Sequence, residues 1–142
     1  MDLVLIDNDE VIFDPVFAPA IVMVKPGKLR GSGSAKIRGQ KICVAGDERD
    51  VEVRGCAYTS GDFNIPGTGR LKITDLASDQ LSKRVKSNSR YVLLQGGRFM
   101  AVFEVEKPAM MMIPAMPPQP DPMPRYIGRG TFSTSNRSVK TD

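Results

Sequence analysis

The chain has 142 residues, about the length of one domain, with a formal net charge of +4, 41% hydrophobic residues and 25% charged residues. Its 13 glycines and 11 prolines, with no tryptophan, indicate many turns and exclude a protein built from long helices. Basic residues alternate with acidic ones, and aromatic residues make up only 6%. Nucleic-acid-binding faces usually combine clustered basic residues with stacking aromatics, so the composition argues against one.

The first residues lack the basic region of a signal peptide, and the apolar run at 3–6 is too short for its hydrophobic core. No stretch approaches the roughly 18 consecutive apolar residues of a membrane-spanning helix. We therefore expect the protein to be made in the cytoplasm and to be soluble there.

Residues 1–24 are predicted to form an N-terminal arm with one or two short strands, because Pro15, Pro19 and acidic residues interrupt the apolar runs. Close carboxylates in this arm resemble a metal or acid–base cluster, but we interpret them as a solvated acidic surface. They are Asp7, Asp9, Glu10 and Asp14.

Residues 25–107 are predicted to form a compact β domain, because alternating runs such as 35–38 and 51–54 are separated by glycine-containing turns, with a first turn at 25–28. One helix is expected at residues 75–85, where Leu76, Leu81 and Val85 fall near one helical face. A closing hairpin is expected from strands at 91–94 and 98–105 around the pair Gly96 and Gly97.

Residues 108–142 form a predicted extension that begins with a run rich in methionine and proline up to residue 124 and ends in a short strand. The run excludes a helix or an inner strand and favours an extended chain near polyproline II. It is either a disordered linker or a strap along an apolar groove, where methionine packs adaptably.

Cys43 and Cys56 are too few to define a disulfide framework. We expect them either to pack as small hydrophobic side chains or to form a disulfide once they meet an oxidising exterior.

Three Gly-x-Gly pairs occur, at 31–33, 67–69 and 128–130, and each is expected to open an alternating strand. Three similar strands suggest a pseudo-threefold object in which Ile37, Leu71 and Phe132 present similar faces about one axis. The alternative is that such pairs are common before strands in turn-rich proteins.

Residues 31–47 resemble the PAAR repeat, in which a Gly-Ser start leads to a turn with glycine and, seven residues later, to Gly-Asp. Gly39, Gly46 and Asp47 keep this spacing. Gly39 would turn a tight hairpin, and Asp47 would bond local backbone at the end of the returning strand. The chain departs from the pattern at Arg38, where the family usually has asparagine, and at residues 41–44, which replace the Pro-Ala-Ala-Arg signature.

The whole chain resembles the PAAR-like tip proteins of extracellular contractile injection systems of the phage-tail kind. The resemblance implies a mainly β fold: a small cone-like PAAR-type β domain with one short helix and extended N- and C-terminal arms. It also implies a structural tip that caps and sharpens a trimeric VgrG-like central spike protein and aids puncture of the target envelope, in a particle that is released from the bacterium. Effector cargo is a second partner to consider.

Zinc-binding members of that family use a His/Cys site, and this chain has no histidine, so no metal or other cofactor is expected. Without histidine, a Gly-x-Ser-x-Gly elbow, a phosphate-binding loop or a dinucleotide fingerprint, we expect no catalytic residue and no enzyme. The residues expected to shape the fold or bind the spike are Gly31, Gly33, Ile37, Gly39, Gly46, Asp47, Gly67, Gly69, Leu71, Gly128, Gly130 and Phe132.

The alternative is a small β-barrel that binds single-stranded nucleic acid through basic residues and two stacking aromatics. The basic residues would be Arg38, Lys41, Arg54, Arg70 and Lys72, and the aromatic ones Tyr58 and Phe63. Salt-sensitive retention on oligonucleotides would favour this reading.

Overall fold

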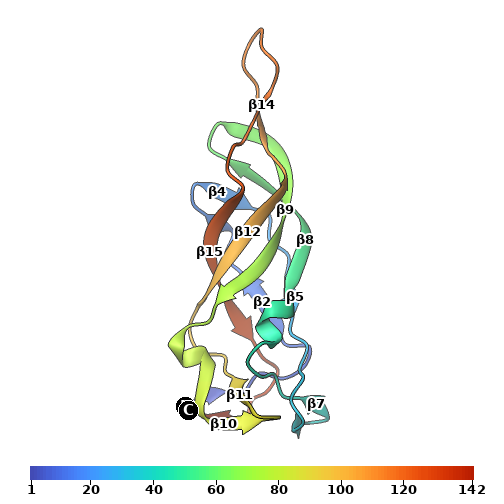
Figure 1. Ribbon diagram of the computed structural model, residues 1–142, viewed down its shortest axis with the longest axis vertical. Coiled ribbons are helices and arrows are strands. Elements are labelled where there is room, and N and C mark those ends of the chain that lie inside the picture. The colour runs from blue at the N-terminus through green and yellow to red at the C-terminus, as the bar shows by residue number, and fades with distance from the viewer.

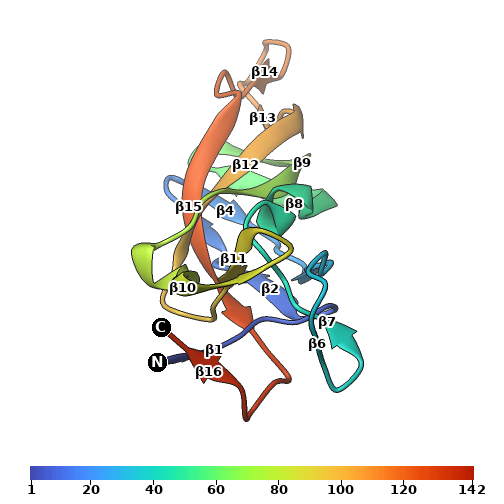
Figure 2. The ribbon, with the colours of Figure 1, turned by 60° about the horizontal axis from the view of Figure 1, so that its bottom comes forward.

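The computed structural model describes all 142 residues and is mainly β, which confirms the predicted fold class. The molecule is elongated and tapers from a broad end to a narrow one (Figure 1). A curled sheet forms the middle, which we call the shaft. A loop projects from the narrow end, and both termini lie at the broad end (Figure 2).

The shaft is one antiparallel sheet whose strands follow the order β3-β4-β8-β9-β12-β15-β2-β5. Two short strands, β13 and β14, pair beside the first residues of β9 and complete ten strands. The bounds are β2 (Glu10–Phe13), β3 (Val16–Phe17), β4 (Ala20–Val22), β5 (Gly27–Lys28), β8 (Glu52–Ser60), β9 (Phe63–Asp75), β12 (Phe99–Lys107), β13 (Met110–Met111), β14 (Gln119–Pro120) and β15 (Arg125–Ser133).

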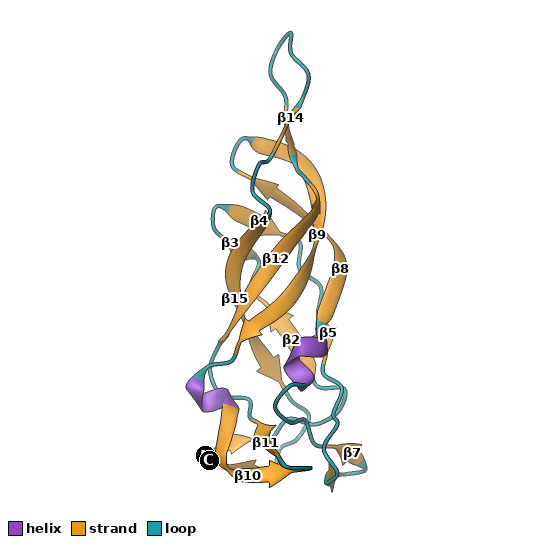
Figure 3. Ribbon diagram, viewed as in Figure 1, coloured by secondary structure: helices purple, strands orange, loops and turns teal.

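Three two-stranded sheets lie at the broad end, around the lower edge of the shaft (Figure 2). They are β1 (Asp2–Leu3) with β16 (Lys140–Thr141), β6 (Lys36–Ile37) with β7 (Gln40–Lys41), and β10 (Leu81–Ser87) with β11 (Arg90–Leu93). The only helical segments are two single turns, Asp47–Asp50 and Ser78–Gln80 (Figure 3).

The predicted helix at 75–85 is wrong, because this stretch contains the end of β9, one helical turn and the strand β10. The apolar residues that suggested a helix do not share one environment: Leu81 packs against the main core, whereas Val85 is 41% exposed. The buried side chain of Gln80 fixes the irregular path by accepting from the Ala77 amide and donating to the Gly97 carbonyl. Tertiary pairing of β10 with β11 therefore overrides the local helical pattern.

The predicted closing hairpin is also wrong. β11 pairs with β10, while β12 pairs with β9 and β15 in the shaft. Gly96 and Gly97 connect two different sheets, and the Gly97 amide donates to the Asp79 carboxylate. Adjacent strands joined by a glycine pair thus diverge instead of turning back on each other.

The arm, domain and extension predicted from the sequence are not separate bodies in the structure. β2, β3 and β4 come from residues 1–24 and β15 from residues 108–142, yet all four strands belong to the sheet that contains β8, β9 and β12. The sheet curls so that Phe17 of β3 approaches β15, where a Cβ added to Gly128 would lie 2.5 Å from its ring. Distant parts of the chain therefore form one shared core.

The Gly-x-Gly pairs do not open strands, contrary to our expectation. The second and third pairs lie inside β9 and β15, and the first lies in the loop before β6. In the shaft, glycine makes room for aromatic rings: an added Cβ would lie 2.5 Å from the Phe103 ring at Gly69 and 2.5 Å from the Phe99 ring at Gly130. Any side chain at these two positions would overpack the core.

Candidate functional site

Three short segments close a ring of hydrogen bonds at the broad end. The amide of Leu5 donates to the carbonyl of Leu93 (3.0 Å), the amide of Leu93 to the carbonyl of Cys43 (2.9 Å), and the amide of Cys43 to the carbonyl of Leu5 (3.0 Å). The segments 4–6, 42–44 and 92–94 are therefore related by an approximate threefold axis. We call them the base triangle, and together with the three two-stranded sheets we call them the base.

The base triangle separates two hydrophobic cores. The central residue of each segment, Leu5, Cys43 or Leu93, belongs to the main core of the shaft. The flanking residues pack with Ile37 into a smaller core of their own. The first residue of each segment pairs with the last residue of another: Val4 with Leu94, Ile42 with Ile6, and Val92 with Val44.

Each segment of the base triangle is followed by a turn that contains a residue with a positive φ angle. Asn8, Gly46 and Gly96 stand three residues after the three centres and have positive φ angles of 69°, 102° and 50°. This region is accessible at low cost mainly to glycine and asparagine. The sequence therefore provides a suitable residue at all three equivalent turns.

Two buried aspartates hold these turns. One oxygen of Asp9 accepts the amide of Ile6 (2.8 Å), and one oxygen of Asp47 accepts the amide of Val44 (2.8 Å). In the third segment, the backbone carbonyl of Gln80 takes the place of the carboxylate. The approximate threefold arrangement thus extends from the ring of hydrogen bonds into the turns that follow it.

An antiparallel pair of strands, which we call a base hairpin whether or not a turn joins its strands, leads into each segment. β1, β7 and β11 lead into residues 4–6, 42–44 and 92–94, and their partners are β16, β6 and β10. Two of these pairs are joined by tight turns, whereas β1 and β16 come from opposite ends of the chain (Figure 2). The base therefore needs both terminal segments for its third hairpin.

The PAAR-like stretch supplies one of the three equivalent units. Gly39 turns the β6–β7 hairpin with φ of 80°, as predicted, and Asp47 bonds local backbone, as predicted. Sequence reasoning missed the other two units. The pattern that would have found them is three apolar residues followed, after one residue, by Asn or Gly and then Asp or Gly, at 4–9, 42–47 and 92–97.

The threefold arrangement is not built from the residues we predicted. Leu71 and Phe132 lie in strands on either side of β12, Ile37 lies at the base, and all three side chains are buried. They cannot present matching faces to a partner, so that prediction is wrong. Of the predicted site residues, the base holds Gly31, Gly33, Ile37, Gly39, Gly46 and Asp47, and the shaft holds Gly67, Gly69, Leu71, Gly128, Gly130 and Phe132.

Both cysteines are buried free thiols in the main core, so the prediction that they pack as small hydrophobic side chains is confirmed. Cys43 is the counterpart of Leu5 and Leu93, and burial raises the pKa of its thiol well above the usual range. A protonated thiol is a poor metal ligand. No group of three or more metal-ligating side chains occurs in the structure, so the residues present do not fit the zinc site of the PAAR resemblance.

The carboxylates near the N-terminus act mainly as acceptors for backbone amides. Asp7 accepts the amide of Gly31 (2.8 Å), and the second oxygen of the buried Asp9 accepts the amide of Ser135 (3.2 Å). Asp14 pairs with Arg98, and only Glu10 is exposed without a partner. The prediction of a solvated acidic surface is therefore wrong for Asp7 and Asp9, which connect the base to its neighbouring loops.

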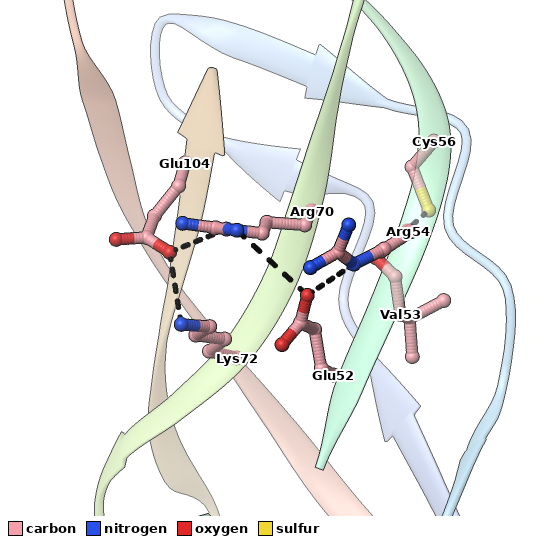
Figure 4. Close-up of polar contacts among 7 residues, drawn as sticks. All are labelled: Glu52, Val53, Arg54, Cys56, Arg70, Lys72 and Glu104. Carbon is pink, nitrogen blue, oxygen red and sulfur yellow. Dashed lines mark hydrogen bonds and ion pairs between the residues drawn. The ribbon is translucent and has the colours of Figure 1, made fainter. Parts of the chain in front are cut away.

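Cross-strand ion pairs cover the outer face of β8, β9 and β12 (Figure 4). Glu104 on β12 lies 2.9 Å from Nε of Arg70 and 3.3 Å from Nζ of Lys72, both on β9. Glu52 on β8 pairs with Arg54 and also approaches Arg70. The hydrogen bond from Arg70 lowers the pKa of Glu104, and the one from Arg54 lowers the pKa of Glu52.

The residues of the alternative nucleic-acid site are not assembled into one surface. Three of its five basic residues are the ion-paired ones on the shaft. Tyr58 is 1% exposed and cannot stack on a base. Arg38 and Lys41 lie on the β6–β7 hairpin at the broad end of the molecule, away from these ion pairs (Figure 1). The structure therefore gives no support to this alternative.

At the narrow end, residues 108–124 form a projecting loop that we call the finger. A buried carboxylate fastens it: Asp121 accepts the hydroxyls of Tyr58 (2.8 Å) and Tyr126 (2.7 Å). The Asp121 amide donates to the carbonyl of Ala109, whose own amide donates to the Tyr58 hydroxyl (2.9 Å). Both ends of the finger are thus tied to β8 and β15 through one cluster.

The finger is neither a disordered linker nor a strap in an apolar groove, and both readings of this run are wrong. β13 and β14 pair within it, and Met110 bridges to Ile65 of β9. Beyond this pair the chain leaves the body, and Met112 and Met116 are 61% and 55% exposed. The methionines and prolines therefore form the apex of the molecule (Figure 1).

Replacing Tyr58 by phenylalanine should change how stability depends on pH. Burial raises the pKa of Tyr58 to about 12, compared with about 10 in an unfolded chain. Because the folded state disfavours the phenolate, the contribution of this group is complete below about pH 10 and is lost as the pH rises through about 12. At about 1.4 kcal/mol per pH unit, the wild type should lose up to about 3 kcal/mol of unfolding free energy that the variant does not lose.

Denaturant titrations between about pH 9 and about pH 12 measure this difference. Tyr91→Phe is the control, because Tyr91 is 37% exposed and lies in the base. An equal loss of stability in all three proteins would show that the Tyr58 hydroxyl does not hold the finger in this way.

A comparison with known protein families identifies the family of this chain. The model of a family described as contractile injection system spike tip protein matches residues 1–142. No curated protein matches the chain. No helix in the structure is long and apolar enough to cross a membrane. Because the family match extends over the whole chain, the protein belongs to the contractile injection system spike tip family.

Proposed function

We propose that the protein caps a trimeric VgrG-like central spike, with the base seated on the spike and the finger pointing toward the target. Family membership supports a spike-tip role in an extracellular particle, and the base triangle supports the finer proposal. A spike of three identical chains ends in three equivalent surfaces about an axis. One chain contacts all three alike only if it presents three similar elements around that axis, as the base triangle and its hairpins do.

The proposed role is mechanical, without catalysis or a cofactor. The shaft buries an aromatic core in which Phe103 contacts both Tyr58 and Phe17, with ring centroids 5.1 Å and 6.2 Å apart. Every buried side-chain nitrogen and oxygen has a hydrogen-bond partner. Close packing with satisfied polar groups gives an interior that deforms little and transmits force. Such a body suits a part that is driven forward under load.

The finger suits the leading position because it is poor in exposed polar groups. From Pro108 to Pro120 the chain has no charged side chain. Pro114, Pro117 and Pro118 have no backbone N–H, and the Met116 amide donates within the finger. Unpaired backbone donors and charges are the groups that cost most in an apolar layer. We propose that the finger meets the lipid of the target envelope first.

Particles that carry Met112→Glu and Met116→Glu should assemble normally but penetrate target membranes less. Each carboxylate adds about 3 kcal/mol to the cost of entering the bilayer centre. Dye release from lipid vesicles on contraction measures the effect. Met23→Glu is the matched control, because Met23 is 73% exposed but follows β4 on the shaft. Equal dye release from both variants would contradict the role of the finger.

The capping proposal predicts one copy of this chain for every three spike chains. Native mass spectrometry of the complex with the trimeric spike of the same particle measures this ratio. A variant that lacks residues 137–142 loses β16 and should bind much more weakly, while the finger variant above should bind like wild type. Circular dichroism would verify that the shaft sheet persists. A ratio of three to three, or no binding by wild type, would contradict the proposal.

A further inference from the structure

The base carries most of the unpaired positive charge of the molecule. Its three two-stranded sheets and the turn between β6 and β7 contain eight exposed basic side chains, and none of them forms a salt bridge in the structure. They are Lys36, Arg38, Lys41, Lys83, Arg84, Lys86, Arg90 and Lys140. The carboxylate side chains in the same elements and their flanking end residues are Asp2 and Asp142. The turns that follow the base triangle also hold Asp7, Asp9 and Asp47, whose oxygens accept backbone amides.

The outer face of β8, β9 and β12 is organised differently. Its basic residues Arg54, Arg70 and Lys72 are paired with Glu52 and Glu104 (Figure 4). Arg98 likewise pairs with Asp14 near the foot of β12. On this face of the shaft the basic side chains are therefore ion-paired within the molecule, whereas the eight basic side chains of the base form no salt bridge with this chain.

Three of the base lysines occupy equivalent positions under the approximate threefold axis. Lys36 stands opposite Lys41, Lys86 opposite Tyr91, and Lys140 opposite Leu3 in the three hairpin registers. The opposing residue is in each case two positions before the centre of its base-triangle segment, which is Cys43, Leu93 or Leu5. All three lysines are exposed. The same charge is therefore repeated three times about one axis.

We infer that Lys36, Lys86 and Lys140 form a basic ring that meets a matching ring of three acidic side chains, one from each chain of the symmetric spike end. The inference rests on the proposed capping function and adds the chemistry of the partner to it. Three equivalent acceptors on a trimer complement three equivalent donors on one chain, which single charges at unrelated positions would not do. Unpaired positive charge at the base also disfavours self-association, because like charges repel.

An electrostatic ring of this kind should speed correct docking and orient the tip about the axis. Exposed charges at the rim of an interface act mainly on the association rate and are screened by salt. Each ring position should contribute similarly, because the trimer offers the same surface three times. The single substitutions are therefore expected to give similar losses, and the triple substitution their product.

Binding of the full-length chain to the trimeric spike of the same particle, measured by surface plasmon resonance, tests the ring. Lys36→Glu, Lys86→Glu and Lys140→Glu should each weaken binding roughly threefold to tenfold, and the triple variant roughly 30-fold to 1,000-fold. Raising the salt from about 50 mM to about 500 mM should weaken binding of wild type and strengthen binding of the triple Glu variant, because salt screens attraction in the first case and like-charge repulsion in the second. The triple Lys→Arg variant should keep wild-type affinity and salt dependence.

Lys107→Glu is the matched control, because Lys107 is exposed at the opposite end of the molecule and should have no effect. Wild-type affinity in the triple Glu variant would overturn the ring and leave capping intact. Absence of binding by wild type would instead overturn the capping function itself. Salt-sensitive retention of wild type, but not of the triple Glu variant, on single-stranded oligonucleotides with no spike binding would assign the ring to nucleic acid and overturn the inference.

Discussion

The ring of backbone hydrogen bonds among Leu5, Cys43 and Leu93 is the constraint on which the rest of the molecule depends. It joins three distant parts of the chain, closes the lower end of the main core and carries the three hairpins of the base. Its bonds are made by main-chain groups, so the central side chains need only be apolar. This explains why a cysteine stands at one corner where leucine stands at the other two.

The shaft and the finger connect the approximately threefold base triangle to a single apex. Above the base triangle the threefold arrangement ends, because the shaft is one continuous curled sheet with a fixed strand order. Gly69 and Gly130 leave room for the rings of Phe103 and Phe99, so the curled sheet stays narrow and its interior is filled. At the top, Asp121 gathers two tyrosine hydroxyls and fastens the finger. One chain thus passes from approximate threefold geometry at one end to a single apex at the other.

Local turn chemistry was predictable from the sequence, and long-range pairing was not. Gly39, Gly46 and Asp47 act within a few residues of their own positions, so their spacing was enough to place one unit of the base. The unit at residues 4–9 was missed because the strand that pairs with its β1 is β16, which comes from the far end of the chain. The false helix at 75–85 arose for the same reason, since only the pairing with β11 makes residues 81–87 a strand.

Asp121 shows the same limit at the finger, because no short-range pattern connects it with Tyr58 on β8. Composition distinguished the methionine- and proline-rich run at residues 108–124 but left open where that run goes. The sequence suggested either a disordered linker or a strap in an apolar groove. In the structure this run instead forms the apex and is held by one buried carboxylate. The central claim that these parts support is that the base sits on a spike. Cryo-electron microscopy of the tip on its spike, reconstructed without imposed symmetry, tests that claim most directly. We predict one copy with the base triangle centred on the spike axis and the finger pointing away, whereas an off-axis copy or a finger turned toward the spike would contradict it.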